Sequence, residues 1–181
     1  MSYKSIVLSG NPGAGKSALA EALSKEYHMS IFSIGKMWRK KYEETHPLKD
    51  ISFADYWKAT NMADNRNVNE VAKIVFEHGN VIGELRYTHN LDKSLCLLVF
   101  LTADLDIRAS RSAGRAEHKG MSISEIAKVL KARENEEVTR AHELYGKDYD
   151  YRDPRNYHLV LDSGKLSIAQ EVAEINALMR K

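Results

Sequence analysis

Short apolar runs alternate along the chain with longer stretches in which apolar residues recur every three or four positions. The short runs have the length and composition of β-strands, and they lie at about 5–9, 30–33, 80–84, 95–101 and 157–161. The run at 95–101 is apolar throughout, as expected of a central parallel strand that is covered on both faces. The pattern therefore predicts five strands.

The stretches between these runs have the period of helices. We expect helices at about 18–25, 36–44, 53–60, 67–78, 104–117, 123–145 and 168–180. Two of them begin with a capping box, formed by Ser122 with Glu125 and by Ser167 with Gln170. Strands that alternate with helices predict an α/β fold with a parallel sheet between two layers of helices. Because the chain contains no repeat or linker, we expect a single domain over residues 1–181.

The composition narrows the class of protein. A formal net charge of +2 is too small to indicate a nucleic-acid partner, which needs a concentrated basic face. No apolar run approaches the length of a membrane span, and the N-terminus leads directly into the first predicted strand, so we expect no signal peptide and a cytoplasmic location. The single cysteine, Cys96, excludes an intramolecular disulfide and is expected to be a small buried hydrophobic residue.

A complete phosphate-binding motif, G-x-x-x-x-G-K-[ST], lies between the first strand and the first helix. It reads Gly10-Asn11-Pro12-Gly13-Ala14-Gly15-Lys16-Ser17. The glycines allow the backbone N–H groups to curl around an anion, and the new helix adds free donors and a positive dipole end. Lys16 is placed to reach the β- and γ-phosphates, and the Ser17 hydroxyl to ligate Mg²⁺. The motif predicts that residues 10–17, together with Ala18, bind a nucleotide.

Other sequence features concern the fate of the γ-phosphate. The D-x-x-G segment and the N-K-x-D guanine reader of switch GTPases do not occur in the sequence. A mechanical ATPase would usually end its second apolar strand in Asp-Glu, whereas the run at 95–101 continues into Thr102-Ala103. Neither class is favoured.

Arginines recur at helical spacing in the second half of the chain. Arg108, Arg111 and Arg115 are expected on one helical face, and Arg133 and Arg140 on one face of the long helix. Arginines on a mobile helical lid could grip a transferring phosphoryl group and exclude water. The alternative is a solvated helix whose arginines pair with nearby carboxylates, which are Glu134, Glu136, Glu137 and Glu143. The spacing alone leaves both interpretations open.

An ordered set of segments resembles the P-loop nucleoside monophosphate kinases, and most closely the short cytidylate kinases of the archaeal type. The resemblance runs nearly end to end, through the Gly10–Ser17 loop, 33–39, Glu84-Leu85-Arg86, the Arg108/Arg111 helix, 133–148 and 156–163. It implies a P-loop fold whose five parallel strands lie in the order 2-3-1-4-5. It also implies a helical acceptor-binding segment over about 36–65 and a helical lid over about 111–142.

The resemblance also implies roles for individual residues. Substrate-binding positions would be Ser33, Gly35, Lys36, Arg39, Glu84 and Arg86, with Arg39 on the acceptor phosphate and Arg86 aligning it. Ser17 and Glu84 would form the metal site. The catalytic cations would be Lys16, Arg86, Arg108, Arg111, Arg133 and Arg140.

Two residues depart from the family pattern. Lys36 stands where the family has an acidic residue, and Leu85 stands where it has glycine. Lysine is disfavoured in the first turn of a helix, and leucine takes space that glycine would leave to the acceptor. Both changes could instead lie just outside the pocket.

Taken together, we expect a monomeric cytoplasmic enzyme that uses ATP and Mg²⁺ to phosphorylate a nucleoside monophosphate, with CMP, dCMP or UMP as acceptor. A first alternative keeps the donor site and transfers to a sugar or a shikimate-like alcohol, with Glu84 beside the acceptor hydroxyl. A second alternative is an ATP-binding regulatory protein with little turnover. Small nucleotides are the expected partners, without nucleic acid or membrane.

Overall fold

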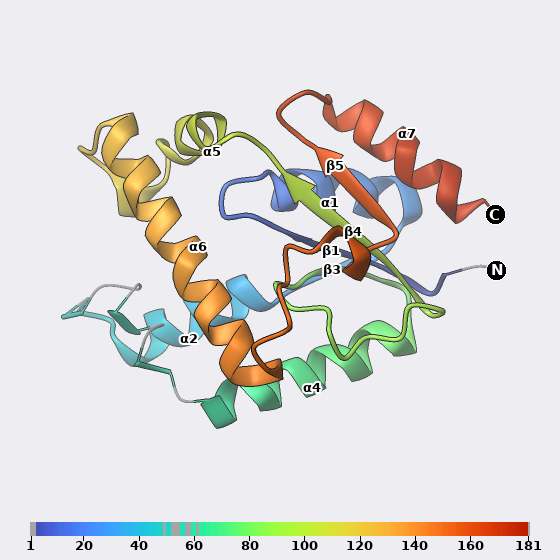
Figure 1. Cartoon of the computed structure of the whole chain (residues 1–181), viewed down its shortest axis with the longest axis horizontal. Helices are drawn as coiled ribbons and strands as arrows, with labels where there is room; N and C mark the ends of the chain where they lie inside the picture. Colours follow the sequence, from blue (N-terminus) through green and yellow to red (C-terminus); the bar gives the residue numbers. More distant parts are fainter. Residues whose placement is uncertain (1–2, 49, 52–54, 57–58, 61, 181) are drawn as a thin grey trace.

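The computed structural model describes residues 3–180 with the exception of 49, 52–54, 57–58 and 61. Its centre is a parallel sheet of five strands in the spatial order β2-β3-β1-β4-β5 (Figure 1), as predicted. The strands are β1 Ser5–Gly10, β2 Ser30–Ser33, β3 Val81–Glu84, β4 Cys96–Thr102 and β5 Leu159–Asp162.

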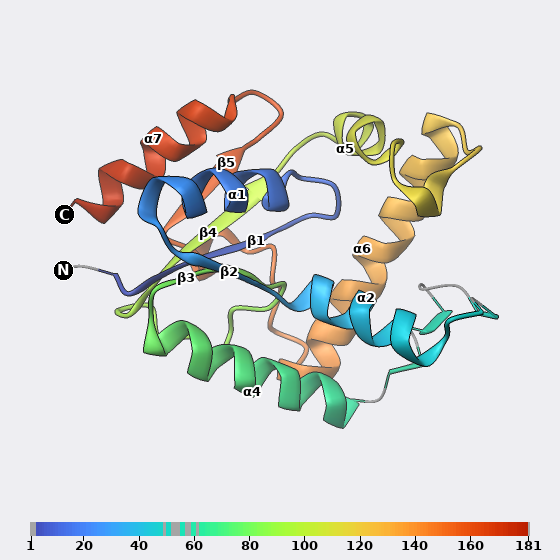
Figure 2. The same cartoon turned by 180° about the vertical axis from the view of Figure 1, so that it is seen from behind.

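The alternation of side chains along β1 explains the two helical layers. Ile6 and Leu8 point to one face of the sheet, where they pack with residues of α1 and α7, while Val7 points to the other face and packs with Phe76 of α4. All three strand residues are completely buried. Figures 1 and 2 show α1 and α7 on one side of the sheet and α4 on the other. The architecture is therefore the three-layer α/β fold expected from the sequence.

The helices start and stop close to the predicted positions, except that α4 begins five residues before its predicted start at 67 and that α5 ends early. Their bounds are α1 Lys16–Tyr27, α2 Ile34–Thr45, α4 Met62–His78, α5 Leu105–Ser112, α6 Ile123–Tyr145 and α7 Ile168–Met179, with short 3-10 turns η1 Ala116–His118 and η2 Pro154–Asn156. Both predicted capping boxes are present, at the starts of α6 and α7. The helix predicted over about 53–60 lies partly outside the described residues, so the structure does not test it.

The early end concerns the helix predicted over 104–117. Helix α5 ends at Ser112, just before Gly114, and the backbone at Arg115 is extended (φ −80°, ψ 144°). Glycine is a poor helix former, which favours an end at this point. The prediction that Arg115 shares a helical face with Arg108 and Arg111 is therefore wrong, because Arg115 follows the helix instead of belonging to it.

Helices α5 and α6 form a unit beyond the carboxyl ends of the strands (Figure 1). Ala109 of α5 packs with Ile126 and Leu130 of α6 in a small buried cluster separate from the two sheet faces. The α5–α6 unit therefore has a small hydrophobic core of its own. Within the part of the chain that the structure describes, no helix is both long enough and apolar enough to cross a membrane.

Candidate active site

A cavity of about 560 Å³ opens at the carboxyl edge of the sheet, between the phosphate-binding loop, the start of α2, the end of β3 and the α5–α6 unit. Most of the residues predicted from the sequence line it. They are Pro12, Gly13, Ala14, Gly15, Lys16, Ser17, Ala18, Ser33, Gly35, Lys36, Arg39, Glu84, Arg86, Arg111 and Arg133. Among the described residues, four predicted ones lie outside this lining: Gly10, Asn11, Arg108 and Arg140.

The loop takes a backbone conformation that only glycine adopts easily. Gly13 and Gly15 have φ values of 83° and 91°. A Cβ atom on Gly13 would lie 2.9 Å from the carbonyl oxygen of Arg108, so the loop is packed tightly against α5. Gly15 is also the N-cap of α1, whose first residues, Lys16, Ser17 and Ala18, line the cavity, and the free N–H groups of a helix N-terminus suit an anion.

Arg108 supports this loop from behind. Its guanidinium donates hydrogen bonds to the carbonyl oxygens of Ala103 (2.8 Å) and Pro12 (3.2 Å), and it forms an ion pair with Glu134 at 3.3 Å. The side chain is buried. The structure thus places Arg108 in the support of the loop, and its role at the phosphoryl group stays a prediction.

Lys16 lies in the loop with its ammonium folded back onto the backbone. Nζ donates to the carbonyl oxygens of Gly10 (2.7 Å) and Asn11 (3.0 Å). Burial, together with the neighbouring charges of Arg86 and Arg133, lowers the pKa of the Lys16 ammonium to about 7, although Glu137 and Glu84 act in the opposite direction. A bound phosphate would supply the negative charge that this ammonium lacks.

This depressed pKa makes nucleotide binding dependent on pH. Above about pH 7 the empty site holds a neutral amine, whereas a bound triphosphate favours the ammonium and raises its pKa, so binding takes up a proton. We expect ATP titration by calorimetry near pH 8, in buffers of different ionisation enthalpy, to show uptake approaching about one proton, and near pH 6 to show much less. Equal proton uptake at both pH values would contradict the assignment of this ammonium to the phosphates.

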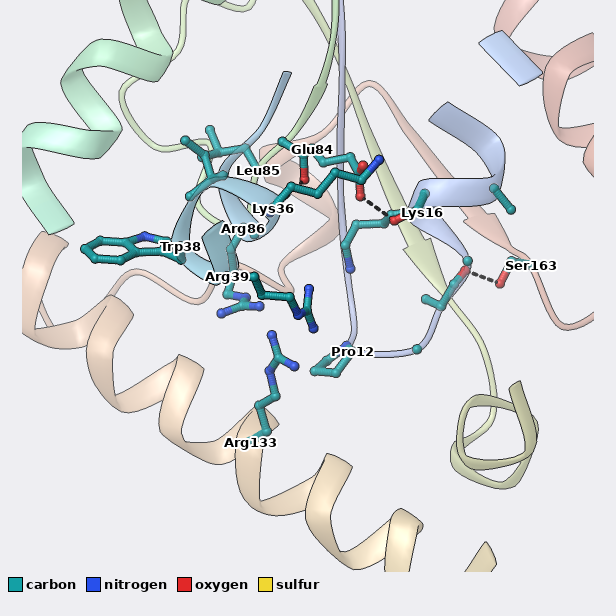
Figure 3. Close-up of a pocket in the computed structure, with 18 of the residues that line it drawn as sticks. Pro12, Lys16, Lys36, Trp38, Arg39, Glu84, Leu85, Arg86, Arg133 and Ser163 are labelled. Atoms are coloured by element: carbon teal, nitrogen blue, oxygen red, sulfur yellow. Dashed lines mark hydrogen bonds between the residues drawn. The ribbon is translucent and has the colours of Figure 1, made fainter. Parts of the chain in front are cut away.

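Ser17 and Glu84 meet at the floor of the cavity. The Ser17 hydroxyl donates to Oε2 of Glu84 at 2.8 Å (Figure 3). The other oxygen, Oε1, is buried and has no hydrogen-bond partner in the described part of the chain. Because a buried carboxylate oxygen without a partner is costly, this atom indicates a missing cation or water. The hydroxyl and the carboxylate are oxygen donors suited to Mg²⁺, and the residues fit a metal ion that shares the phosphates of a bound nucleotide.

Other metal arrangements are not favoured. Among the described residues, no group of three His, Cys, Asp or Glu side chains is placed to hold a metal ion on its own. A Mg²⁺ ion at Ser17 would therefore depend on the nucleotide for most of its ligands, as Mg²⁺ in kinase sites does.

Three arginines approach one another across the cavity from different elements. Figure 3 shows Arg39 of α2, Arg86 after β3 and Arg133 of α6 with their guanidinium groups gathered beside the loop. Arg86 and Arg133 both pair with one carboxylate, that of Glu137, and Arg39 pairs with Glu117 at 3.4 Å. Burial and the charge of Arg86 lower the pKa of Arg133 to about 10, so its guanidinium stays charged at neutral pH.

The remaining predicted cations have other contacts. Arg111 donates to the hydroxyl (3.0 Å) and the carbonyl oxygen (2.7 Å) of Ser163, whose hydroxyl in turn donates to the carbonyl of Ala14 in the loop. Arg140 donates to the Thr60 hydroxyl at 2.9 Å. Arg133 and Arg140 lie two turns apart on α6, as expected, and of the two Arg133 lines the cavity.

The two departures from the family pattern both border the cavity. Lys36 lies exposed in the first turn of α2, where its backbone N–H donates to the Ser33 hydroxyl that caps the helix. Leu85 is 4% exposed and belongs to the hydrophobic core, and its N–H donates to the carbonyl of Leu8. Leu85 therefore combines a place in the cavity wall with a packing role.

Several lining residues were not singled out from the sequence. They are Trp38, Asn65, Val68, Asn69, Tyr87, Ser163, Leu166, Ile168 and Glu171. For Trp38, the sequence does offer a signal, because its place early in the helix that Ser33 caps predicts that it lies near the acceptor-binding residues. Glu171 lies on α7, far along the chain from the loop, and burial raises the pKa of its carboxyl. No local pattern predicts its approach to the cavity.

Comparison with known proteins agrees with this geometry. The family model of the cytidylate kinase-like family matches residues 5–165. The cytidylate kinase of Methanopyrus kandleri is 28% identical over 175 residues, covering 90% of this chain and 86% of that protein. The cytidylate kinase of Ignicoccus hospitalis is 32% identical over 179 residues, covering 96% and 98%. Among solved structures, the shikimate kinase of Acinetobacter baumannii in complex with shikimate has a TM-score of 0.61 at 13% identity, covering 98% of this chain and 93% of that chain.

The strand-loop-helix unit and the sheet order define a P-loop α/β fold, which the likeness to solved structures shares. The chain belongs to the cytidylate kinase-like family, and with it to the ATP-dependent nucleoside monophosphate kinases.

Proposed function

We propose that this protein transfers the γ-phosphoryl group of ATP to a pyrimidine nucleoside monophosphate, CMP, dCMP or UMP. The observation that carries the proposal is the position of Arg39 and Arg86, which line the cavity from α2 and from the end of β3, with their guanidinium groups beside the phosphate-binding loop. An acceptor with its own phosphate needs a second set of cations beyond those that hold the donor, and these guanidiniums supply it. The names of the archaeal relatives support the choice of acceptor.

The catalytic roles follow from these positions. The acceptor is already an anionic phosphate oxygen, so the protein needs no strong general base, and catalysis consists of positioning and charge stabilisation. Residues 10–18 would hold the donor phosphates, Lys16 the β- and γ-phosphates, and Arg39 and Arg86 the acceptor phosphate. Mg²⁺ held at Ser17 and Glu84 would neutralise charge on the donor phosphates.

The α5–α6 unit is proposed to act as a lid over about 111–142. It brings Arg111 and Arg133 to the cavity, and Glu117 at its η1 turn already pairs with Arg39 of α2 across the opening. Closure over bound substrates would exclude water, which protects ATP from hydrolysis. A monomeric state and a cytoplasmic location stay predictions.

The acceptor base would lie against α2 and α4. Trp38 and Tyr87 supply flat apolar surface, and the amides of Asn65 and Asn69 supply hydrogen-bonding groups. Asn69 donates from Nδ2 to the Tyr145 hydroxyl at 2.8 Å, which fixes its amide with the carbonyl oxygen as an acceptor. Such a wall suits a small base with an amino or imide edge.

A panel assay tests the acceptor. We expect ADP release, followed by a coupled assay, with CMP, dCMP or UMP well above that with AMP, GMP, shikimate or gluconate. Lys36→Asp is expected to raise the KM for the monophosphate about tenfold, because it replaces a cation near the acceptor phosphate with an anion. Lys40→Asp, in the same helix and outside the cavity lining, is the matched control for the charge change. A lower KM in Lys36→Asp would show that the lysine obstructs the acceptor.

Leu85 needs a different variant. Truncating the buried Leu85 side chain to alanine costs about 2–5 kcal/mol, and glycine adds backbone freedom to that cost. Leu85→Ala is therefore the milder variant, and its turnover is compared with wild type well below the melting temperatures of both proteins.

Transfer to an alcohol is the second candidate, and Glu84 favours it. A carboxylate with an unpartnered oxygen beside the transfer site could accept a hydroxyl proton. The likeness to shikimate kinase at 13% identity concerns the fold alone. Turnover of an alcohol in the panel, without turnover of any monophosphate, would select this candidate. ATP binding without ADP release on any acceptor would select a regulatory protein.

A further inference from the structure

Glu137 of α6 is completely buried, yet it contacts two of the arginines that line the cavity. Its Oε1 atom lies 2.9 Å from Nη2 of Arg86 and 3.0 Å from Nε of Arg133. The two arginines come from positions that are far apart in the sequence, one after β3 and one on α6. A single oxygen atom therefore links the sheet side of the cavity to the lid side.

The carboxylate is itself held in place from behind. Its second oxygen, Oε2, accepts a hydrogen bond from the Tyr151 hydroxyl at 3.0 Å, and the backbone carbonyl of Glu137 accepts one from the Tyr87 hydroxyl at 2.9 Å. Tyr151 is completely buried and belongs to the core against the sheet. With both oxygens bonded, the carboxylate has little freedom to rotate.

The contact on Arg133 leaves its phosphate-binding side available. Arg133 uses Nε for Glu137, and within the described chain its two terminal nitrogens donate to no protein acceptor. A guanidinium fixed at one edge and open at the other is pre-organised for bidentate contact with a phosphoryl group. In Figure 3 the guanidinium of Arg133 extends toward Arg39 and the loop.

The charges point to the same role. Burial and the neighbouring charges of Arg86 and Arg133 lower the pKa of Lys16, and the charge of Glu137 raises it. Without a counter-charge, these cations would repel one another and turn toward solvent when no nucleotide is bound. Glu137 offsets this repulsion at a point that the substrate does not need to occupy.

We propose that Glu137 is a positioning residue, which fixes Arg86 and Arg133 in the orientation that stabilises the transferring phosphoryl group. The inference rests on the proposed function, because it assigns those two arginines to phosphoryl transfer. It predicts that loss of the carboxylate charge lowers kcat while the ground-state binding of ATP is kept.

A second buried carboxylate on the same helix shows that burial and pairing alone do not define this role. Glu134 pairs with Arg108 at 3.3 Å and with Arg152 at 3.4 Å, and among the described residues neither of these arginines lines the cavity. Glu134 ties α6 to α5 and to the segment before β5. Glu137 differs because its partners face the substrates.

The test compares Glu137→Gln with wild type in steady-state kinetics. We expect kcat to fall on the order of 10²-fold, because an amide cannot offset two guanidiniums or hold both. The KM for ATP should stay the same or decrease, since the variant cavity is more cationic. Tyr151→Phe removes only the hydroxyl bonded to Oε2, and a smaller fall in kcat, of roughly 3- to 10-fold, is expected without a change of charge. This second variant keeps the test decisive if Glu137→Gln folds poorly.

Two controls separate positioning from general destabilisation. Glu143→Gln makes the same charge change at an exposed position of α6 and should leave kcat unchanged. Phe100→Leu is expected to weaken the core next to Tyr151 without touching the carboxylate, so it controls for a loss of stability alone. A kcat for Glu137→Gln equal to that of wild type, or a fall in kcat shared with an equally destabilised Phe100→Leu, would overturn the inference.

The wild-type measurement keeps the two proposals apart. If wild type releases no ADP with any monophosphate, the proposed function fails before any variant is considered. If wild type is active and the ratio of kcat values is close to one, only the role of Glu137 fails.

Discussion

Lys16→Ala is expected to abolish phosphoryl transfer while the fold is retained. A charged donor of this kind contributes about 3 kcal/mol or more to transition-state stabilisation, so kcat should fall at least on the order of 10²-fold. The ammonium is the cation closest to the loop backbone, with Nζ at 2.7 Å from the Gly10 carbonyl. The coupled ADP-release assay at saturating substrates measures the effect, and circular dichroism checks the fold.

The fold should survive because the lysine lies at the cavity and not in the core. Water entering the cavity can replace Nζ as the donor to the carbonyls of Gly10 and Asn11. Removing a cation that burial disfavours also relieves repulsion with Arg86 and Arg133. Activity at the wild-type level in a folded Lys16→Ala protein would refute the assignment of the loop.

Cys96→Ser is the matched control away from the cavity. Cys96 is fully buried in β4, and burial raises the pKa of its thiol to about 12, so the thiol is not a nucleophile at neutral pH. The substitution should leave the chemistry unchanged and cost about 1–3 kcal/mol of stability through a buried hydroxyl.

The fold and the loop could be predicted because their signals are local. The apolar run at 95–101 and the eight-residue loop motif each carry their meaning within a few residues, and the alternation of strands and helices limits the topology. The strand order came from the family resemblance, and the structure confirms it. The end of α5 was missed because helical spacing continues through Arg115 although the backbone does not.

The site could be predicted only in part, because its finer arrangement depends on distant contacts. Sequence spacing offered Glu137 as one of several surface partners for arginines, and it could not show that this carboxylate is buried between Arg86 and Tyr151. Arg108 and Arg111 are three residues apart, yet one supports the loop from behind and the other borders the cavity. The packing of a helix decides which of its faces meets the substrate. The contact between α5 and α6 depends on both helices together, so the sequence of either one does not predict it.

Arg133→Ala is expected to lower kcat on the order of 10²-fold and to change ATP affinity much less. Its guanidinium faces the cavity from α6 and is fixed by Glu137 at 3.0 Å, so it can meet charge that develops on the phosphoryl group in the transition state. We expect ATP affinity to depend mainly on the loop and on Lys16, which this substitution leaves in place. Equilibrium titration of ATP and steady-state kinetics, measured on the same preparation, separate the two effects.

Arg140→Ala is the informative comparison, because both arginines are on α6 and the substitution is the same. Arg140 donates to the Thr60 hydroxyl at 2.9 Å, in the segment assigned to the acceptor, and in the described structure it lies outside the cavity lining. We expect this variant to raise the KM for the monophosphate more than it lowers kcat, since a contact between α6 and the acceptor segment acts on binding and closure. If Arg133→Ala weakens ATP binding and turnover to the same extent, Arg133 serves ground-state binding only. If neither variant changes either quantity, the α5–α6 unit is a solvated cover whose arginines merely pair with their own carboxylates.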